Sequence, residues 1–262
     1  MLLNMISLGE AVDERPPVVL LHGLFGSARN WGQHQKTLAL GGRQVIAMDL
    51  RNHGESPHGP VPSYAVMAED VAETLSGLGI SRCRVLGHSM GGKVAISLAL
   101  ARPDLLERVI VADIAPRAYS HGNLDLVAAM QALEIRPGMT RAEAGAALAP
   151  RIPDAMIRSF LLLSLRLGST APNGWRIGLA ELGRAMPVIE GWEPVPGHYD
   201  GPALFISGSR SHYVAEEARP AIRALFPAAR FAVLEGAGHW LHVDDPAGFI
   251  AAITPFLDEA AP

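Results

Sequence analysis

Six short apolar runs, rich in valine and isoleucine, recur along the chain, and stretches of helical period separate most of them. The runs are residues 17–22, 44–49, 83–88, 108–114, 202–207 and 230–235. Each run is continuously apolar rather than alternating, so both faces of every strand are expected to be covered. This pattern predicts an α/β fold with a mostly parallel central sheet of about seven strands and helices on both faces. Residues 2–8 are a candidate for one edge strand.

Composition and charge exclude several classes of protein. Of the 262 residues, 49% are hydrophobic, which is enough for a full core, and the net charge of -4 argues against a nucleic-acid partner. A single cysteine, Cys83, rules out an intrachain disulfide and Cys-x-x-Cys metal clusters. Residues 1–10 lack a basic signal-peptide region, and no apolar run approaches the roughly 18 residues that cross a bilayer. We therefore expect a cytoplasmic protein without membrane insertion.

Strand signals stop between residues 117 and 195, where helical pattern is broken at 137–138, 150–153 and 172–174. We expect about four helices here, forming a cap (lid) of residues 117–195 inserted in a core domain of residues 1–116 and 196–262. The alternative is that these helices simply thicken the core.

Two signals mark the starts of helices within this segment. Thr140 and Glu143 have the spacing of a capping box. Pro153 suits the first position of a helix. The apolar residues expected on that helix are Met156, Phe160, Leu163 and Leu167.

A nucleophile motif, Gly-His-Ser-Met-Gly at 87–91, directly follows the third apolar run and precedes an apolar helix. A Gly-x-Ser-x-Gly elbow requires this strand-turn-helix context, in which a strained serine exposes its hydroxyl at the carboxyl end of the sheet. The flanking glycines let strand and helix cross closely. We predict that Ser89 is the nucleophile; the alternative is a glycine-rich turn with an incidental serine.

The first apolar run leads into His-Gly-Leu-Phe-Gly-Ser at 22–27. Attack of Ser89 on a carbonyl places negative charge on oxygen, and two rigid backbone N–H groups would stabilise that charge. Met90 is expected to supply one, and Leu24 is favoured over Phe25 for the other. The alternative for this loop is an ordinary strand terminus.

Ten histidines compete for the role of base. His239 lies in Gly-Ala-Gly-His at 236–239, on a loop at the carboxyl end of the last strand, from which it can reach Ser89. It would take the hydroxyl proton and return it to the leaving group. The other candidates are expected elsewhere: His242 in a turn leading away, His88 on the opposite side of its strand, His22 in a structural hydrogen bond, and His53 and His58 on a polar loop.

With nucleophile and late histidine in this order, the chain resembles an α/β-hydrolase over essentially its whole length. Within that superfamily, Asp-Leu-Arg-Asn-His-Gly-Glu-Ser-Pro-His at 49–58 is similar to a loop of the YbfF-type serine esterases. Residues 22–27, 87–93 and 236–239 agree with the same group. The resemblance implies a serine carboxylesterase or acyl thioesterase that needs no cofactor. We expect residues 49–58 to form an internally bonded turn that supports the 22–27 loop.

No carboxylate stands where most α/β-hydrolases carry the acid of the triad, after the strand that follows the cap. Asp113 instead ends the strand beside the elbow, where it would hold His239 in the required tautomer. YbfF-type esterases resemble this arrangement in placing Asp-Ile or a similar pair there. Asp113 is therefore the predicted acid, although it could merely cap the entry to the lid. Other carboxylates are Asp200 at the wrong strand end, Glu216 and Glu217 in an expected helix, and Glu235 and Asp244 as substitutes.

Large apolar residues are candidates to line an acyl pocket, because sites of this type are concave and mostly apolar. For any one of them, packing between cap and core is the alternative. The candidates are Phe25, Phe160, Leu163, Trp175, Met186 and Trp240.

The predicted function is a serine-dependent carboxylic ester hydrolase, which cleaves small-molecule esters or thioesters through an acyl-serine intermediate. No metal or cofactor is expected, because no cluster shows ligand spacing. Alternatives on the same triad are an enol-lactone or carbon-carbon bond hydrolase and a cofactor-free perhydrolase, and a non-catalytic ligand-binding protein is a further one. A haloalkane dehalogenase is disfavoured, because Ser89 stands where that chemistry needs a carboxylate.

Overall fold

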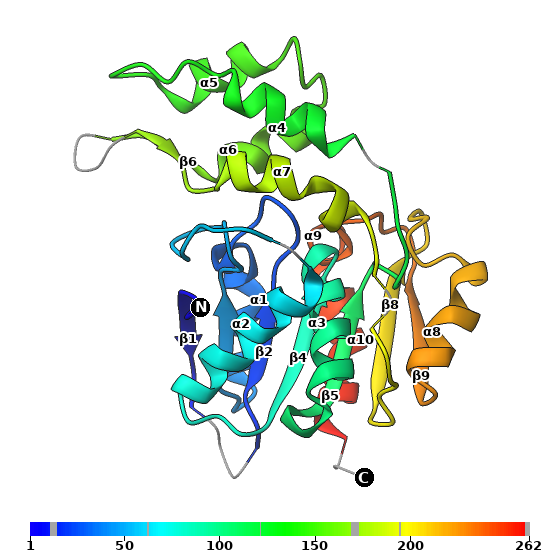
Figure 1. The fold of residues 1–262 in the computed structure, drawn as a ribbon. Coiled ribbons are helices and arrows are strands. Elements are labelled where there is room, and N and C mark those ends of the chain that lie inside the picture. Colours follow the sequence, from blue (N-terminus) through cyan, green and yellow to red (C-terminus); the bar gives the residue numbers. More distant parts are fainter. Residues whose placement is uncertain (11–14, 62, 121, 169–172, 194, 260–262) are drawn as a thin grey trace.

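One seven-stranded sheet forms the centre of the computed structural model, which describes residues 1–10, 15–61, 63–120, 122–168, 173–193 and 195–259 (Figure 1). The strand order is β1-β3-β2-β4-β5-β8-β9, and β1 alone runs antiparallel to its neighbour. The predicted mostly parallel sheet is confirmed, including the amino-terminal edge strand. The strands are β1 Met5–Leu8, β2 Val18–Leu21, β3 Val45–Met48, β4 Cys83–His88, β5 Leu106–Ala112, β8 Ala203–Gly208 and β9 Ala229–Leu234.

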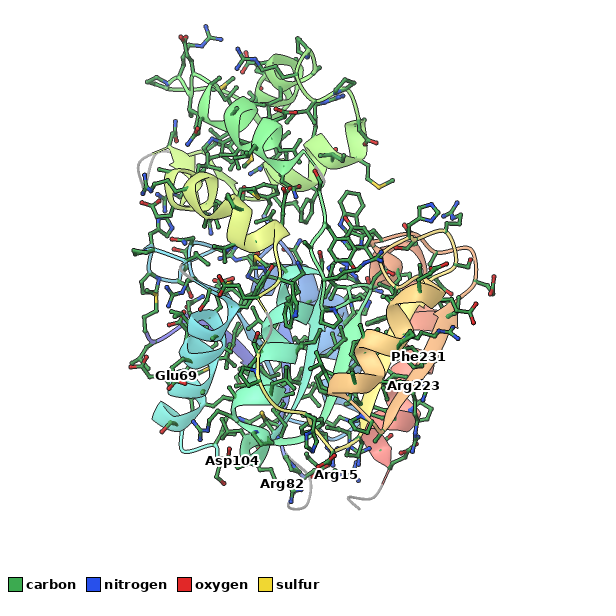
Figure 2. All side chains as sticks on the ribbon, turned by 45° about the vertical axis from the view of Figure 1, so that its right-hand side comes forward. Arg15, Glu69, Arg82, Asp104, Arg223 and Phe231 are labelled. Carbon is green, nitrogen blue, oxygen red and sulfur yellow. The ribbon has the colours of Figure 1, made fainter. Side chains whose placement is uncertain are left out.

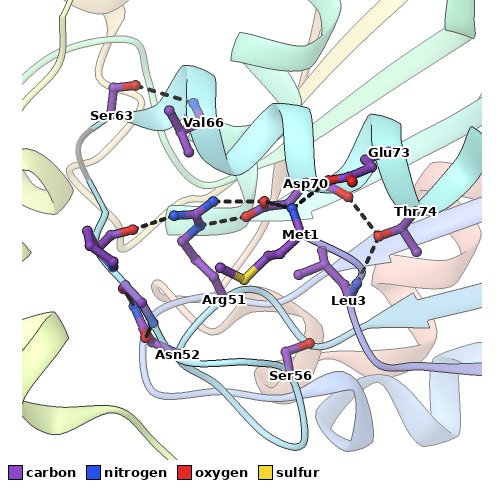
Figure 3. Close-up of polar contacts among 12 residues, drawn as sticks. Met1, Leu3, Arg51, Asn52, Ser56, Ser63, Val66, Asp70, Glu73 and Thr74 are labelled. Atoms are coloured by element: carbon purple, nitrogen blue, oxygen red, sulfur yellow. Dashed lines mark hydrogen bonds and ion pairs between the residues drawn. The ribbon is translucent and has the colours of Figure 1, made fainter.

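Helices cover both faces of this sheet, as the apolar runs predict. One face carries α2 (Tyr64–Gly77), α3 (Met90–Ala101) and α8 (Arg219–Leu225); the other carries α1 (Gly32–Leu40) and α10 (Pro246–Asp258). Ser63 caps α2, since its hydroxyl accepts a hydrogen bond from the Val66 N–H at 3.3 Å (Figure 3). The shorter helical pieces are η1 Ala28–Trp31, η2 Pro103–Leu105, η3 Glu216–Ala218 and α9 Leu241–Asp244.

The last strand departs from the prediction that every strand is covered on both faces. β9 lies at the edge of the sheet, and its Val233 is 48% exposed. Phe231 of the same strand is half-buried beneath α8, where the Arg223 guanidinium lies 5.2 Å from the ring centroid (Figure 2). The Arg219 guanidinium lies over the same ring, 5.0 Å from its centroid, so α8 and its arginines cover one face of this edge strand only in part.

Four helices of the segment between β5 and β8 lie beyond the carboxyl ends of the parallel strands (Figure 1). Among the described residues of this segment, they are α4 Asn123–Gln131, α5 Arg141–Leu148, α6 Ala155–Leu162 and α7 Leu179–Glu190. Residues 117–195 are called the inserted segment below. The predicted capping box begins α5: the Glu143 N–H donates to the Thr140 hydroxyl, and the Thr140 N–H donates to the Glu143 carboxylate.

Two expectations for the inserted segment were wrong. Pro153 does not occupy the first helical position, because Asp154 caps α6 by accepting from the N–H groups of Met156 and Ile157 at 2.8 and 3.0 Å. Strands are not absent either, since β6 (Leu165–Arg166) pairs with β7 (Gly174–Trp175). Two-residue strands leave no periodicity to detect. The expected break at 172–174 begins at a residue outside the described ranges.

Within the described ranges, none of the helices combines the length and the apolar composition that a membrane crossing requires.

Candidate active site

Ser89 sits in a tight turn between β4 and α3. Its φ of 52° lies in the left-handed region that side chains rarely adopt, and its half-buried side chain stays reachable from outside. The turn requires glycine on both sides, because a Cβ on Gly87 would lie 2.1 Å from the Gly91 carbonyl oxygen, and one on Gly91 2.5 Å from that of Leu21. The local geometry is that of a strained strand-to-helix elbow presenting a hydroxyl.

Three side chains predicted separately meet at this turn. His239 Nε2 lies 3.1 Å from Ser89 Oγ, and His239 Nδ1 lies 2.7 Å from Asp113 Oδ2. Asp113 is fully buried, whereas a quarter of the His239 side chain is exposed. The Nδ1–H therefore donates to the carboxylate, which leaves Nε2 to accept the serine proton.

Asp113 is held by more than the histidine. Its φ of 54° turns the chain sharply at the end of β5, and its N–H donates to the Ile206 carbonyl on β8 at 2.8 Å. The Gly208 N–H and the Ser211 hydroxyl also donate to its carboxylate. These donors fix the orientation of the carboxylate, so that Oδ2 faces the imidazole.

His239 has two supports that the sequence analysis missed. The ring of Tyr213 stacks on the imidazole, with centroids 4.0 Å apart and an angle of 17° between the planes. On the other side, His88 Nε2 donates to the His239 carbonyl at 2.8 Å, so His88 does not turn wholly away from the elbow. Burial keeps the pKa of His88 well below its ordinary value, which suits a neutral structural donor.

The 22–27 loop lies against the elbow. Its backbone N–H groups differ in whether they already donate a hydrogen bond. The Phe25 N–H donates to His53 Nε2 at 3.1 Å, so it is already occupied. The N–H groups of Leu24 and Met90 donate to no other described residue. His22 is the structural histidine that was expected: Nδ1 donates to the Gly23 carbonyl at 2.8 Å.

Residues 49–58 form the internally bonded loop that was predicted, and they are joined to the 22–27 loop. Asp49 accepts from the Ala28 N–H at 2.7 Å and from the Glu55 N–H at 3.0 Å. The Arg51 guanidinium makes a two-point contact with the buried Asp70 of α2, at 2.5 and 2.7 Å (Figure 3). Burial lowers the pKa of His53 to about 3, so at neutral pH its Nε2 accepts the Phe25 N–H.

The predicted pocket residues are not all in one place. Phe160 of α6 contacts Trp240, the neighbour of His239, with ring centroids 5.5 Å apart and both side chains half-buried. Phe25 is buried in the loop beside the elbow, at a φ of 64°.

The other three predicted pocket residues are Leu163, Trp175 and Met186, and each has different neighbours. Leu163 is 64% exposed and borders a hollow of about 150 Å³ together with Gly26 and Ser27. The Trp175 indole N–H donates to the Met130 carbonyl at 3.0 Å, and Met186 is buried in the core.

An elbow serine beside a histidine and a carboxylate, at the carboxyl ends of a mostly parallel sheet, is the arrangement of an α/β-hydrolase. A family model described as "alpha/beta hydrolase fold" matches residues 16–246, and the chain belongs to that family.

Proteins that are named esterases and lipases match nearly the whole chain. An sn-1-specific diacylglycerol lipase ABHD11 of Danio rerio is 40% identical over 92% of this chain and 78% of its own length. The esterase YbfF of Escherichia coli is 38% identical over 93% of both chains. The solved structure of a marine microorganism esterase superposes with a TM-score of 0.90 at 33% identity, covering 97% of this chain and 99% of that one.

These relatives support serine ester hydrolysis rather than the other chemistries considered for this triad. The protein is a carboxylic ester hydrolase.

Proposed function

We propose that Ser89 attacks the carbonyl of an ester or thioester, with His239 as general base and Asp113 as the group that orients it. The hydrogen-bonded series from Ser89 Oγ through His239 to Asp113 Oδ2 is the observation that carries the proposal. His239 takes the hydroxyl proton as the Ser–O–C bond forms and gives it to the leaving alcohol or thiol. Water, deprotonated by the same imidazole, then releases the acid from the acyl-serine.

The N–H groups of Leu24 and Met90 would hold the oxyanion in both steps. Met90 begins α3, so its N–H has no partner within the helix, and the partial positive charge of the helix start favours an anion there. Because the Phe25 N–H already donates to His53, Leu24 is favoured as the second donor to the oxyanion. His53 and the 49–58 loop would then hold the donor loop in place.

The inserted segment would act as a cap over this site, with residues 1–116 and 196–262 as the core. The contact between Phe160 and Trp240 supports this role, because it joins α6 to the loop of His239. These two rings, with Phe25 and Leu163, would form the apolar side of the substrate site. Trp175 and Met186 would stabilise the cap instead.

The substrates would be small-molecule esters or thioesters that carry an acyl chain. Half-buried aromatic rings beside His239 favour an apolar acyl group, since they present carbon surface to it. The names of the relatives, an esterase and a diacylglycerol lipase, agree with that class.

Replacement of Ser89 by alanine tests the proposal directly. Rates would be measured with p-nitrophenyl esters from acetate to palmitate and with acyl-CoA thioesters. We expect Ser89→Ala to lose at least about three orders of magnitude in kcat while its unfolding midpoint stays unchanged. The matched control is Ser97→Ala on the same helix, whose buried hydroxyl has no hydrogen-bond partner among the described residues; it should keep full activity. A Ser89→Ala protein with more than about a tenth of the parent rate would refute the assignment.

A further inference from the structure

Lys93 is a cation in an unusual place. The chain has only two lysines, and while Lys36 is exposed on α1, Lys93 is 2% exposed on α3, one turn after Ser89. Its backbone N–H donates to the Ser89 carbonyl at 3.1 Å. A buried ammonium is costly unless its N–H groups find acceptors, so its partners indicate its role.

Those partners are three consecutive carbonyls at the end of α7. Lys93 Nζ lies 3.3 Å from the Ile189 oxygen, 3.4 Å from that of Glu190 and 2.6 Å from that of Gly191. The last carbonyls of a helix lack partners within it and carry partial negative charge, which favours a cation. The rings of Tyr64 and Tyr119 complete the surroundings, with centroids 5.3 and 5.2 Å from Nζ.

The chain enters and leaves the inserted segment at this same point, on one side of the molecule (Figure 1). The Tyr119 N–H, before α4, donates to the Glu190 carbonyl at 2.8 Å, and Asn123 Nδ2 donates to the Glu190 carboxylate at 2.9 Å. The Tyr64 hydroxyl donates to the Ile189 carbonyl at 2.6 Å. We call Tyr119, Asn123 and residues 189–191 the neck.

Contacts also lead from the neck to His239. The Tyr119 hydroxyl donates to the Tyr213 carbonyl, and the two rings lie 5.0 Å apart. Tyr213 in turn stacks on the His239 imidazole. Lys93 therefore lies between the backbone of Ser89 and the support of His239.

We infer that Lys93 is a positioning residue: its ammonium fixes the neck to the helix that begins after Ser89, and so holds the inserted segment over the substrate site. The expected effect on turnover rests on the proposed function. The attachment of the neck to α3 by Lys93 does not. Burial lowers the pKa of Lys93 to about 8, with the Glu190 carboxylate opposing that shift, so the ammonium form predominates at neutral pH.

Lys93→Met tests the inference, because methionine keeps much of the length and removes the charge and all three donors. Hydrogen exchange should quicken at least about tenfold in the last turn of α7 and at the Tyr119 N–H, with β2 and β4 unchanged. KM for decanoyl and longer esters should rise at least about fivefold, while kcat on the acetate ester stays within about twofold. Lys36→Met on the surface is the matched control and should match the parent in both measurements.

Tyr64→Phe provides a second variant should Lys93→Met fail to fold. It removes one donor to the Ile189 carbonyl and keeps the ring, so it should show the same pattern with smaller changes. Unchanged exchange at the neck, exchange that quickens equally in β2 and β4, or a loosened neck with an unchanged KM would each overturn the inference. An active Ser89→Ala protein would refute the proposed function alone, because the exchange measurements do not depend on turnover.

Discussion

The Asp113 carboxylate draws together two strands and a loop. It follows β5, yet the hydroxyl of Ser211 and the N–H of Gly208, at the end of the neighbouring β8, both donate to it. A serine thus stands where a carboxylate is common in α/β-hydrolases, and it contacts the carboxylate of the adjacent strand. The carboxylate that contacts His239 Nδ1 therefore comes from β5, which lies between β8 and the elbow strand β4.

Asparagine at position 113 should therefore disable turnover without unfolding the protein. An amide presents an N–H₂ group where the His239 Nδ1–H needs an acceptor, so kcat in purified, folded protein should fall at least about a hundredfold. Asp200→Asn is the control, because that side chain is 77% exposed and its carboxylate lies 3.1 Å from the exposed His198 imidazole. If Asp200→Asn lost the activity and Asp113→Asn kept it, the assignment of the acid would be wrong.

Sequence patterns selected Ser89, His239 and Asp113 because residues that follow parallel strands share one edge of a sheet, and the three side chains do lie within hydrogen-bond distance there. Their catalytic roles remain a proposal. The supports of His239 were not foreseen: Tyr213 and His88 act through ring stacking and a backbone carbonyl. Such contacts depend on the final packing of distant segments and leave no local pattern. Lys93 was missed for the same reason, since its acceptors lie about a hundred residues away in the chain.

The close crossing of β4 and α3 determines which side chains can be accommodated at the elbow. Gly87→Ala would place a methyl group against the Gly91 backbone, so we expect a loss of more than about 2 kcal/mol in the free energy of unfolding, measured with urea. Gly32→Ala in α1 is the control: that glycine is helical with open space around it, and alanine there should stabilise by about 0.5 kcal/mol. Equal unfolding midpoints for Gly87→Ala and the parent would contradict this account.

Whether a segment forms a helix or a strand was easier to predict than where it begins or where it lies in the sheet. Central strands such as β4 matched because burial on both faces produces continuous apolar runs. The start of α6 was missed because Pro153 and Asp154 are both favourable near a helix start, and only the hydrogen bonds of the Asp154 carboxylate decide between them. β9 reads like a central strand in sequence, since its position at the edge depends on the order of strands in the sheet.

Several histidine side chains are buried in the interior of the molecule, where burial favours their neutral form. Burial lowers the pKa of His53 to about 3 and that of His242 to about 3, the second also through His34 and His239. Below about pH 6.5 the unfolded chain binds protons at these side chains while the folded protein does not. The free energy of unfolding must therefore fall as the pH drops from about 6.5 towards 3.

Each such histidine should contribute a slope of about 1 kcal/mol per pH unit in the lower part of that window. Urea unfolding at pH 7.5, 6.0 and 5.0 measures the slope. His242→Phe should reduce it, because His242 packs against Trp31 and Phe249, and its Nδ1 has no hydrogen-bond partner among the described residues. A parent slope that is flat from pH 6 to 5, or one that the variant leaves intact, would contradict the expectation.

The neck has a consequence for how this protein changes over evolution. Because Tyr119 and Glu190 are joined by a backbone hydrogen bond, the chain enters and leaves the inserted segment at one place. We expect a stretch bounded in this way to accept longer loops or different helices without a change in the spacing of β5 and β8. Under the proposed function, changes within this stretch would alter substrate preference, while the strand ends that carry Ser89 and Asp113 would keep their positions.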